Sequence, residues 1–311
     1  MSDDASQRQR RRATSAPCST EGCREDRWAG SASGCCLYHA KENGADTETA
    51  RRVWQLARQR GRKADANFEG WHFPSDPAMK GFQKVVFAAA PNFDGATFSG
   101  AVYLRDADFS GTDGYDTCSF RKTHFKSWAY FDDAIFMQAD FIGAVFEGRA
   151  SFGNARFHAG AQFYDCSFEQ ADFSNASFEE IAAFADASFS GDASFDNAVF
   201  ADSSFVHAQF HGTASFVGAR FTADASFTNS VFLSAVFSDA SFAAKADFDG
   251  ARAADKVAFD LADERHQDQA PPFAEHRHSQ TAYRLAKQAA QDSGDYRRAG
   301  EYHYAEQCAI E

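Results

Sequence analysis

A phenylalanine recurs at every fifth or sixth position from Phe120 to Phe248, and this spacing constrains the fold more than any other feature of the sequence. Each of these 25 phenylalanines has a small residue two positions before it, which is alanine in 20 cases. The other small residues are Cys118, Thr123, Cys166, Ser203 and Ser230. The position between the small residue and the ring is mostly polar, as in Ala150-Ser151-Phe152.

Neither a helix nor a flat strand can place this series on one side. Steps of five residues rotate by about 140° around an α-helix, so the rings would spread over every face. In a flat strand, odd steps alternate between the two sides. We therefore expect the chain to turn a corner once per unit. The resulting coil would enclose every phenylalanine together with the small residues that leave room for it.

The phenylalanine series also has a longer period. From Gly114 the steps to successive phenylalanines are 6, 5, 6, 5, 5 and 5 residues, and this set of 32 residues repeats from Phe146, Phe178 and Phe210. A fixed long period of this kind is typical of a solenoid, in which each unit contacts mainly its neighbours.

The units resemble the repeats of the pentapeptide-repeat family, whose consensus is alanine, aspartate or asparagine, leucine or phenylalanine, and two variable residues. Ala139-Asp140-Phe141, Ala171-Asp172-Phe173 and Ala246-Asp247-Phe248 match it directly. The resemblance runs from about Ala64 to Phe259. It implies a mainly β fold, a right-handed, parallel, four-sided β-helix with about four units per coil.

This sequence differs from the family pattern in using phenylalanine almost exclusively and in adding a sixth residue at regular places. With four units per coil, the six-residue steps would always fall on the same two opposite sides. We therefore predict bulges on two opposite walls and coils of 21 or 22 residues, because twelve units span 64 residues.

Composition indicates where the chain works. No apolar run approaches the roughly 18 residues needed to span a membrane, and the polar start lacks the apolar core of a signal peptide. The seven cysteines include Cys118 and Cys166 in the small interior position, which fits a reducing compartment better than a disulfide framework. We expect a cytoplasmic protein.

Charge is distributed unevenly along the chain. Residues 1–63 hold 13 basic and 8 acidic side chains, whereas residues 120–259 hold 9 and 18. A basic head therefore precedes an acidic rod, and the negative surface is explained most simply by solubility.

Residues 1–17 are predicted to form a disordered basic arm with Arg8, Arg10, Arg11 and Arg12. Such an arm could contact nucleic acid or an acidic partner, although a solvated tail is the simpler interpretation.

Residues 18–63 are predicted to contain a zinc knuckle followed by a helix. Cys18, Cys23, Cys36 and His39 have the spacing of a tetrahedral Cys3His site, with Cys35 as the alternative to Cys36. Four protein ligands leave no open position, so the zinc would be structural. The segment resembles the small Cys/His knuckle that precedes the repeats in some bacterial and archaeal members of the family, which favours a prokaryotic source.

A helix is predicted over residues 47–60, with an apolar side formed by Ala50, Val53, Trp54 and Ala57. The opposite side is basic, with Arg51, Arg52, Arg58, Arg60, Arg62 and Lys63. This side could face a phosphate backbone, although here too solvation is the simpler interpretation.

The coil is predicted over residues 64–259. Pro74 and Pro77 interrupt its rhythm, so we interpret Trp71 to Lys80 as a loop that covers the first coil and shields its β-edge.

Residues 260–278 read as a linker and residues 279–311 as a helical hairpin. Ser279 is predicted to cap a helix ending at Gly294, and Asp295 to cap a second helix that runs to the end. The predicted facing apolar residues are Tyr283, Ala286 and Ala290 in one helix and Tyr296, Ala299 and Tyr302 in the other.

This hairpin resembles a tetratricopeptide-like helix pair that follows the coil in some relatives, and we expect it to cap the last coil. In certain relatives the pair leads to a membrane-embedded module. Because no helix-ending signal precedes Glu311, that module would be absent or the sequence cut short.

No sequence motif for catalysis is present: there is no phosphate-binding glycine loop, zinc-protease motif or nucleophile elbow. Asp140, Asp172 and Asp247 recur too regularly to mark one active site. We therefore expect a protein that is not an enzyme.

Two function classes remain, and the favoured one is a non-catalytic scaffold that presents a regular surface to an unknown protein partner. The alternative, implied by the family resemblance, is an acidic, dimeric, DNA-mimicking rod that binds a type II topoisomerase. Only Asp132-Asp133 and Glu179-Glu180 are adjacent acidic pairs within residues 120–259, which is sparse for such mimicry. A third hypothesis is the soluble part of a membrane-associated assembly.

Overall fold

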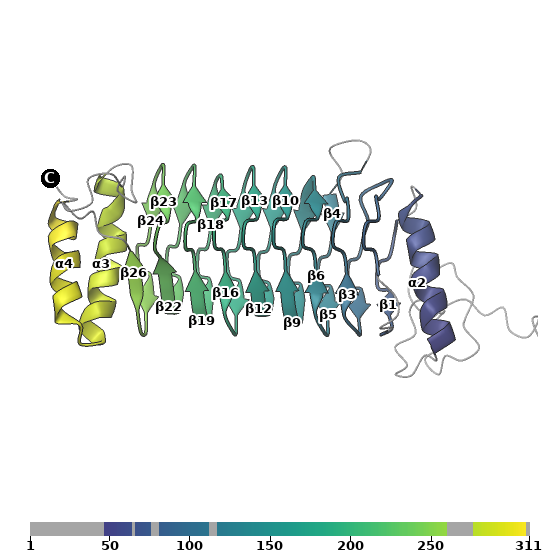
Figure 1. Ribbon diagram of the computed structural model, residues 1–311, viewed down its shortest axis with the longest axis horizontal. Helices are drawn as coiled ribbons and strands as arrows, with labels where there is room; N and C mark the ends of the chain where they lie inside the picture. Colours follow the sequence, from purple (N-terminus) through teal and green to yellow (C-terminus); the bar gives the residue numbers. More distant parts are fainter. Residues whose placement is uncertain (1–46, 64–65, 76–80, 112–116, 260–275, 309–311) are drawn as a thin grey trace, which may run out of the picture.

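The computed structural model describes residues 47–63, 66–75, 81–111, 117–259 and 276–308. These residues form a rod of about eight stacked coils, with one helix across its N-terminal end and two helices across its C-terminal end (Figure 1). All strand pairs are parallel, and each pairs with the strand one coil away. The predicted mainly β, four-sided solenoid is confirmed.

The strands of the described residues form three parallel sheets. The 13-stranded sheet contains β1 (His72–Phe73), β2 (Thr97–Phe98), β3 (Val102–Tyr103), β5 (His124–Phe125), β6 (Ala129–Tyr130), β9 (Val145–Ser151), β12 (Ser167–Asp172), β15 (Ser188–Phe189), β16 (Ala193–Ser194), β19 (Gln209–Ser215), β22 (Val231–Phe237), β25 (Arg252–Ala253) and β26 (Val257–Phe259). The 6-stranded sheet contains β7 (Ile135–Phe136), β10 (Arg156–Phe157), β13 (Ser177–Phe178), β17 (Val199–Phe200), β20 (Arg220–Phe221) and β23 (Ser241–Phe242). The 7-stranded sheet contains β4 (Thr117–Ser119), β8 (Gln138–Asp140), β11 (Ala161–Gln162), β14 (Ala182–Ala183), β18 (Ser203–Ser204), β21 (Ala225–Ser226) and β24 (Ala246–Asp247).

The core consists of columns of stacked phenylalanine rings that run along the rod. Phe125 stacks on Phe146 with ring centroids 4.6 Å apart, and Phe146 stacks on Phe168 at 4.8 Å. Between columns, rings such as Phe131 and Phe141 meet edge to face at 5.5 Å. Both geometries are favourable for aromatic pairs. All 25 phenylalanines of the regular series are buried, as the spacing predicted.

The small residues two positions before the rings are buried as well. Where they are polar, several donate to carbonyl groups inside the coil, as Thr123 Oγ1 does to Phe93 O at 2.7 Å and Ser230 Oγ to Phe227 O at 2.7 Å. These hydrogen bonds offset the cost of burying the hydroxyl groups.

The predicted bulges lie on two opposite walls. Phe146 pairs with Phe168 and Phe168 with Phe189, so successive coils contain 22 and 21 residues. On one wall the register shifts between Phe168 and Gln170, where a five-residue step pairs with a six-residue step. On the opposite wall, Phe157 and Ala161 pair with Phe136 and Ala139, which again sets a longer segment against a shorter one. We name the first of these the long-strand wall, because β9, β12, β19 and β22 run through it.

Two opposite corners of each coil are turns that contain one residue with positive φ. At one corner Asp133 (φ 57°), Asn154 (57°) and Asn175 (58°) occupy this position in successive coils. The Ala134 amide donates to Phe131 O at 3.1 Å across the turn. Asparagine, aspartate and glycine tolerate this backbone region, which explains their recurrence two residues after alternate phenylalanines.

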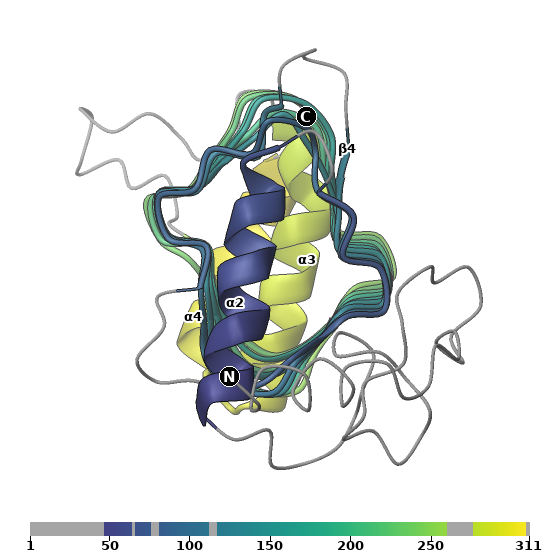
Figure 2. The ribbon, with the colours of Figure 1, turned by 90° about the vertical axis from the view of Figure 1, so that its right-hand side faces the viewer.

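The N-terminal end of the coil is closed by α2 (Thr47–Gly61), which lies across its opening (Figure 2). The predicted apolar side is buried, and the Trp54 ring lies 5.0 Å from Phe73 and 5.7 Å from Phe82. Trp54 Nε1 also donates to Pro74 O at 3.0 Å.

The prediction that Trp71 to Lys80 is a loop covering the first coil was wrong for its first residues. Trp71 is buried, and β1 pairs with β2 within the 13-stranded sheet. Phe73 stacks on Phe98 at 4.5 Å, so it belongs to a ring column. The covering element is α2, and residues 76–80 lie outside the described part of the chain.

At the C-terminal end, α3 (His276–Asp292) and α4 (Tyr296–Cys308) form the predicted helical hairpin, and α3 packs on the last strands. The Tyr283 ring meets Phe259 edge to face at 6.5 Å. The Tyr302 hydroxyl lies 3.2 Å from both the backbone N and O of Phe259, so it can accept from the amide and donate to the carbonyl. The predicted capping of the last coil is therefore confirmed.

Two details of the hairpin differ from the prediction. Helix α3 begins at His276, before Ser279, because the helical backbone continues into the segment read as linker. Tyr296 is 77% exposed, because it is the first residue of α4, next to the turn, while Ala299 and Tyr302 are buried. The Asp295 cap is confirmed, since the Arg298 amide donates to Asp295 Oδ1 at 3.1 Å.

Candidate interaction surface

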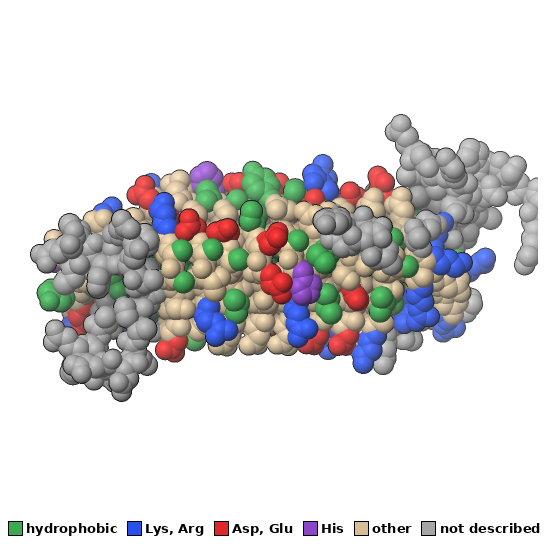
Figure 3. Space-filling view, turned by 90° about the horizontal axis from the view of Figure 1, so that it is seen from above, with side chains coloured by type: hydrophobic (Ala, Val, Ile, Leu, Met, Phe, Trp, Pro, Cys, Tyr) green, Lys and Arg blue, Asp and Glu red, His purple; other side chains and the backbone are tan. Residues whose placement is uncertain are grey.

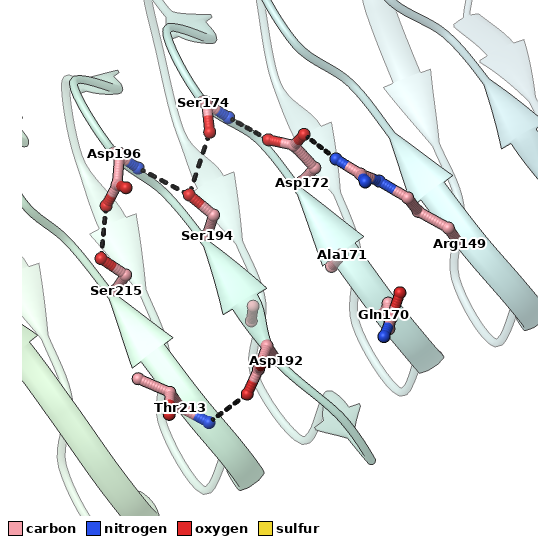
Figure 4. A pocket seen from close by; sticks show the side chains of 11 residues that line it. Arg149, Gln170, Ala171, Asp172, Ser174, Asp192, Ser194, Asp196, Thr213 and Ser215 are labelled. Carbon is pink, nitrogen blue, oxygen red and sulfur yellow. Dashed lines mark hydrogen bonds and ion pairs between the residues drawn. The ribbon is translucent and has the colours of Figure 1, made fainter.

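Polar side chains on the walls of the coil are used mainly to join one coil to the next. Arg149 Nη2 donates to Asp172 Oδ2 at 2.5 Å, and Ser215 Oγ donates to Asp196 Oδ1 at 2.5 Å (Figure 4). Asp172 Oδ1 also accepts from the Ser174 amide at 3.0 Å. The regularly spaced aspartates are thus structural, as the sequence pattern indicated.

The same pattern recurs on the opposite wall. Asp140 accepts from Arg121 Nη1 at 2.9 Å and from the Ile142 amide at 2.9 Å. Asp247 accepts from the Asp249 amide at 2.9 Å and pairs with Lys245 at 2.8 Å. Burial tends to raise the pKa of Asp247, but the hydrogen bonds from Lys245 and the Asp249 amide lower it overall.

A shallow hollow of about 460 Å³ lies on the long-strand wall (Figure 4). It forms where the five-residue step from Phe168 to Phe173 lies between six-residue steps on both neighbouring coils. Its lining is polar and includes Arg149, Gln170, Asp192 and Thr213.

The carboxylates of this hollow have partners within the protein. Asp192 Oδ1 accepts from the Thr213 amide at 2.8 Å, and Asp196 Oδ1 accepts from the Val217 amide at 3.0 Å. Burial alone would raise the pKa of Asp172, but hydrogen bonds from Ser174 and Arg149 hold it below its ordinary value. Such groups stay ionised at neutral pH, and they link neighbouring coils.

The two described cysteines are unsuited to nucleophilic chemistry. Cys118 and Cys166 are buried and free. Burial raises the pKa of each thiol well above its ordinary value, with nearby carboxylates adding to the effect. Both thiols therefore remain protonated inside the coil.

An exposed cluster of aromatic side chains interrupts the otherwise polar long-strand wall. Tyr103 and Tyr130 stack across adjacent coils at 5.1 Å, and Trp128 meets Tyr130 edge to face at 5.8 Å. The Arg105 guanidinium lies 4.4 Å from the centre of the Tyr130 ring and pairs with Asp132 at 2.9 Å. We call Tyr103, Arg105, Trp128 and Tyr130 the aromatic patch.

Trp128 is the most accessible member of the aromatic patch, with 52% of its surface exposed. It lies over Gly148 of the next coil, where an added Cβ would be 3.0 Å from the indole Cδ1. Burial against neighbours, chiefly Tyr103, raises the pKa of Tyr130. The rings are therefore held in fixed positions by the wall beneath them.

The aromatic patch was not predicted from the sequence. Its residues come together only because one coil places Tyr130 beside Tyr103, 27 positions earlier. The only signal available was the change from serine and aspartate to tyrosine at the position before the second ring of the coil.

The predicted zinc ligands Cys18, Cys23, Cys36 and His39, and the alternative Cys35, lie outside the described residues. In the part of the chain that the structure describes, no three histidine, cysteine, aspartate or glutamate side chains are grouped as a metal site. The same residues include no helix with the length and apolar character needed to cross a bilayer.

Comparison with protein families agrees with the coil geometry. A family model described as pentapeptide repeats (9 copies) matches residues 82–135, 131–177 and 173–220. The chain is a pentapeptide-repeat solenoid. A comparison with curated proteins gave no significant match. Pentapeptide-repeat solenoids are generally non-catalytic, and the repeats here form a scaffold of the same kind.

Proposed function

We propose that this pentapeptide-repeat solenoid is a non-catalytic scaffold that binds a protein partner through the long-strand wall. The observation that carries the proposal is the aromatic patch, in which an exposed tryptophan, two tyrosines and an arginine are fixed on a rigid wall. Tryptophan, tyrosine and arginine are the residues that most often dominate the binding energy of protein interfaces.

Rigidity supports this role. Each ring of the aromatic patch rests on a coil whose interior is filled by stacked phenylalanines, so little side-chain freedom remains to be lost on binding. The partner would meet preformed rings rather than order a loop.

The distribution of charge favours a scaffold over a DNA-mimicking rod that binds a topoisomerase. Carboxylates on the walls are neutralised by neighbouring bases in the pairs Arg105–Asp132, Arg121–Asp140, Arg149–Asp172 and Lys245–Asp247. Acidic and basic side chains are interspersed on the face seen in Figure 3. A mimic of duplex DNA needs unbroken rows of negative charge.

The buried free thiols support a reducing compartment, and we propose the cytoplasm of a prokaryotic cell. In that setting neither Cys118 nor Cys166 would be needed for a disulfide.

The proposal can be tested by affinity capture from native lysate with the full-length protein and two variants. Trp128→Ala removes the centre of the aromatic patch, whereas Ile181→Ala removes an equally exposed apolar side chain elsewhere, since both are 52% exposed. We expect Trp128→Ala to weaken capture of a specific partner by about 30-fold, as for a hot-spot residue, and Ile181→Ala to leave it unchanged. Equal capture by both variants would contradict the proposal.

A third protein lacking residues 1–46 separates the wall from the N-terminal segment. This deletion leaves α2 in place over the first coil. Partner binding should persist, and its complete loss would assign the interaction to residues 1–46 instead.

A further inference from the structure

The outer side of α2 carries a concentration of positive charge that the rest of the protein lacks. Arg51, Arg52, Arg62 and Lys63 are exposed on or just after this helix. In Figure 3, lysine and arginine side chains gather at the end of the rod where α2 lies. The coil itself is acidic, with 18 acidic and 9 basic side chains in residues 120–259.

The bases of α2 differ from those of the walls in their pairing. Arg121 and Arg149 on the walls each contact a carboxylate within 2.9 Å. Within the described part of the chain, Arg52, Arg62 and Lys63 form no ion pair. Their charges are therefore available to a partner.

Two other bases of the helix fix it in place. Arg58 Nη1 donates to Gly81 O at 3.0 Å, and the Arg60 guanidinium lies 5.3 Å from the centre of the Trp71 ring. Burial lowers the pKa of Arg58, and the nearby charge of Arg62 lowers it further, which shows that positive charges crowd this surface. The basic surface is thus held rigidly against the coil.

The helix dipole explains only part of this arrangement. Basic side chains stabilise the last turn of a helix, which accounts for Arg58 and Arg60. It does not account for Arg51 and Arg52 in the first half. Residues 52 and 63 lie eleven positions apart, so they share one side of the helical path and extend the positive surface over about 16 Å.

We propose that the outer side of α2, centred on Arg52, Arg62 and Lys63, binds the phosphate backbone of a nucleic acid. Arginine and lysine suit phosphate oxygens, and arginine can contact them through two parallel hydrogen bonds. An acidic protein is the less fitting partner, because protein interfaces need a buried apolar centre. Among the exposed positions 51, 52, 55, 59, 62 and 63 of this surface, none is apolar.

The acidic coil determines how the nucleic acid would approach. Its walls repel a polyanion, so contact is favoured only at the α2 end of the rod. Backbone contacts alone carry no base sequence information, and we expect binding that is independent of sequence.

The test uses the full-length protein with three labelled probes: a DNA duplex of about 20 base pairs, single-stranded RNA of about 20 nucleotides, and polyglutamate. We expect a Kd of roughly 10⁻⁶–10⁻⁴ M for the nucleic acid at physiological salt, weakening steeply as salt rises. The comparison of DNA with RNA shows which strand form is preferred. Binding of polyglutamate alone would overturn the proposal in favour of an acidic protein.

Two variants with equal changes in net charge locate the surface. The triple variant Arg52→Gln, Arg62→Gln, Lys63→Gln should weaken nucleic-acid binding by about 10- to 100-fold and reduce the slope of log K against log salt by about 2.7 for duplex DNA. The control variant Arg156→Gln, Arg220→Gln, Lys256→Gln removes three exposed bases from the walls and should change neither. Equal weakening in both variants, or no binding by the wild type, would overturn the proposal.

Discussion

The two ends of the coil are closed by different chemistry. At the N-terminal end, α2 inserts Trp54 among the rings of Phe73, Phe82 and Phe98. At the C-terminal end, Tyr302 reaches the backbone amide and carbonyl of Phe259 with one hydroxyl. One cap therefore covers exposed rings, and the other satisfies an open strand edge. Both remove surfaces through which coils of separate molecules could pair.

The Trp54→Ala variant should show the largest effect, because it removes the main aromatic contact of the N-terminal cap. Truncation of a buried tryptophan costs about 3–5 kcal/mol. We expect a lower melting temperature and concentration-dependent association, measured by calorimetry and by light scattering. A variant that melts like the wild type and stays monodisperse would show that α2 is dispensable as a cap.

The Tyr302→Phe variant keeps the ring of the C-terminal cap and removes only its hydroxyl. Leaving the Phe259 amide and carbonyl without this partner should cost about 1–3 kcal/mol. Denaturant unfolding followed by near-ultraviolet circular dichroism can measure the change. Tyr304→Phe, at a 71% exposed position, is the matched control and should be neutral.

Acid should weaken the C-terminal hairpin. Glu306 of α4 contacts Arg284 and Lys287 of α3. Although burial raises the pKa of Glu306, the contacts with Lys287 and Arg284 lower it below its ordinary value of 4.5. A lowered pKa in the folded state gives stability that is present above pH 4.5 and is lost as the pH falls through the lowered value.

We therefore expect Glu306→Gln to lower the melting temperature at pH 7 and to make little difference in strong acid. Melting curves of both proteins across this pH range measure the effect. A constant difference between them at every pH would contradict the assignment.

The smallest effect on the coil is expected from the predicted zinc knuckle. The Cys18→Ser variant should lose one zinc per chain, measured by metal analysis of the purified protein, because structural zinc requires all four ligands. The unfolding of the coil should change little. Retention of zinc in this variant, or absence of zinc from the wild type, would refute the ligand assignment.

The sequence was sufficient to predict the coil because each ring contacts mainly its equivalents one coil away. Counting steps between phenylalanines therefore located the bulged walls and the coil lengths. It failed at Trp71 to Phe73, where Pro74 obscured the five-residue step from Phe68 to Phe73. The aromatic patch could not be predicted, because it depends on which outward residues of different coils become neighbours. That relation is set by the number of residues per coil, and not by any local pattern.

The central claim is that stacked phenylalanines fill the coil and that alanine leaves them the room to do so. The most direct test compares the melting temperatures of Ala187→Leu and Ser188→Leu. Ala187 is fully buried and Ser188 is its half-buried, outward-facing neighbour. We predict a loss of about 3 kcal/mol for Ala187→Leu through overpacking and almost none for Ser188→Leu. Equal melting of the two variants, or an unchanged Ala187→Leu, would contradict the account.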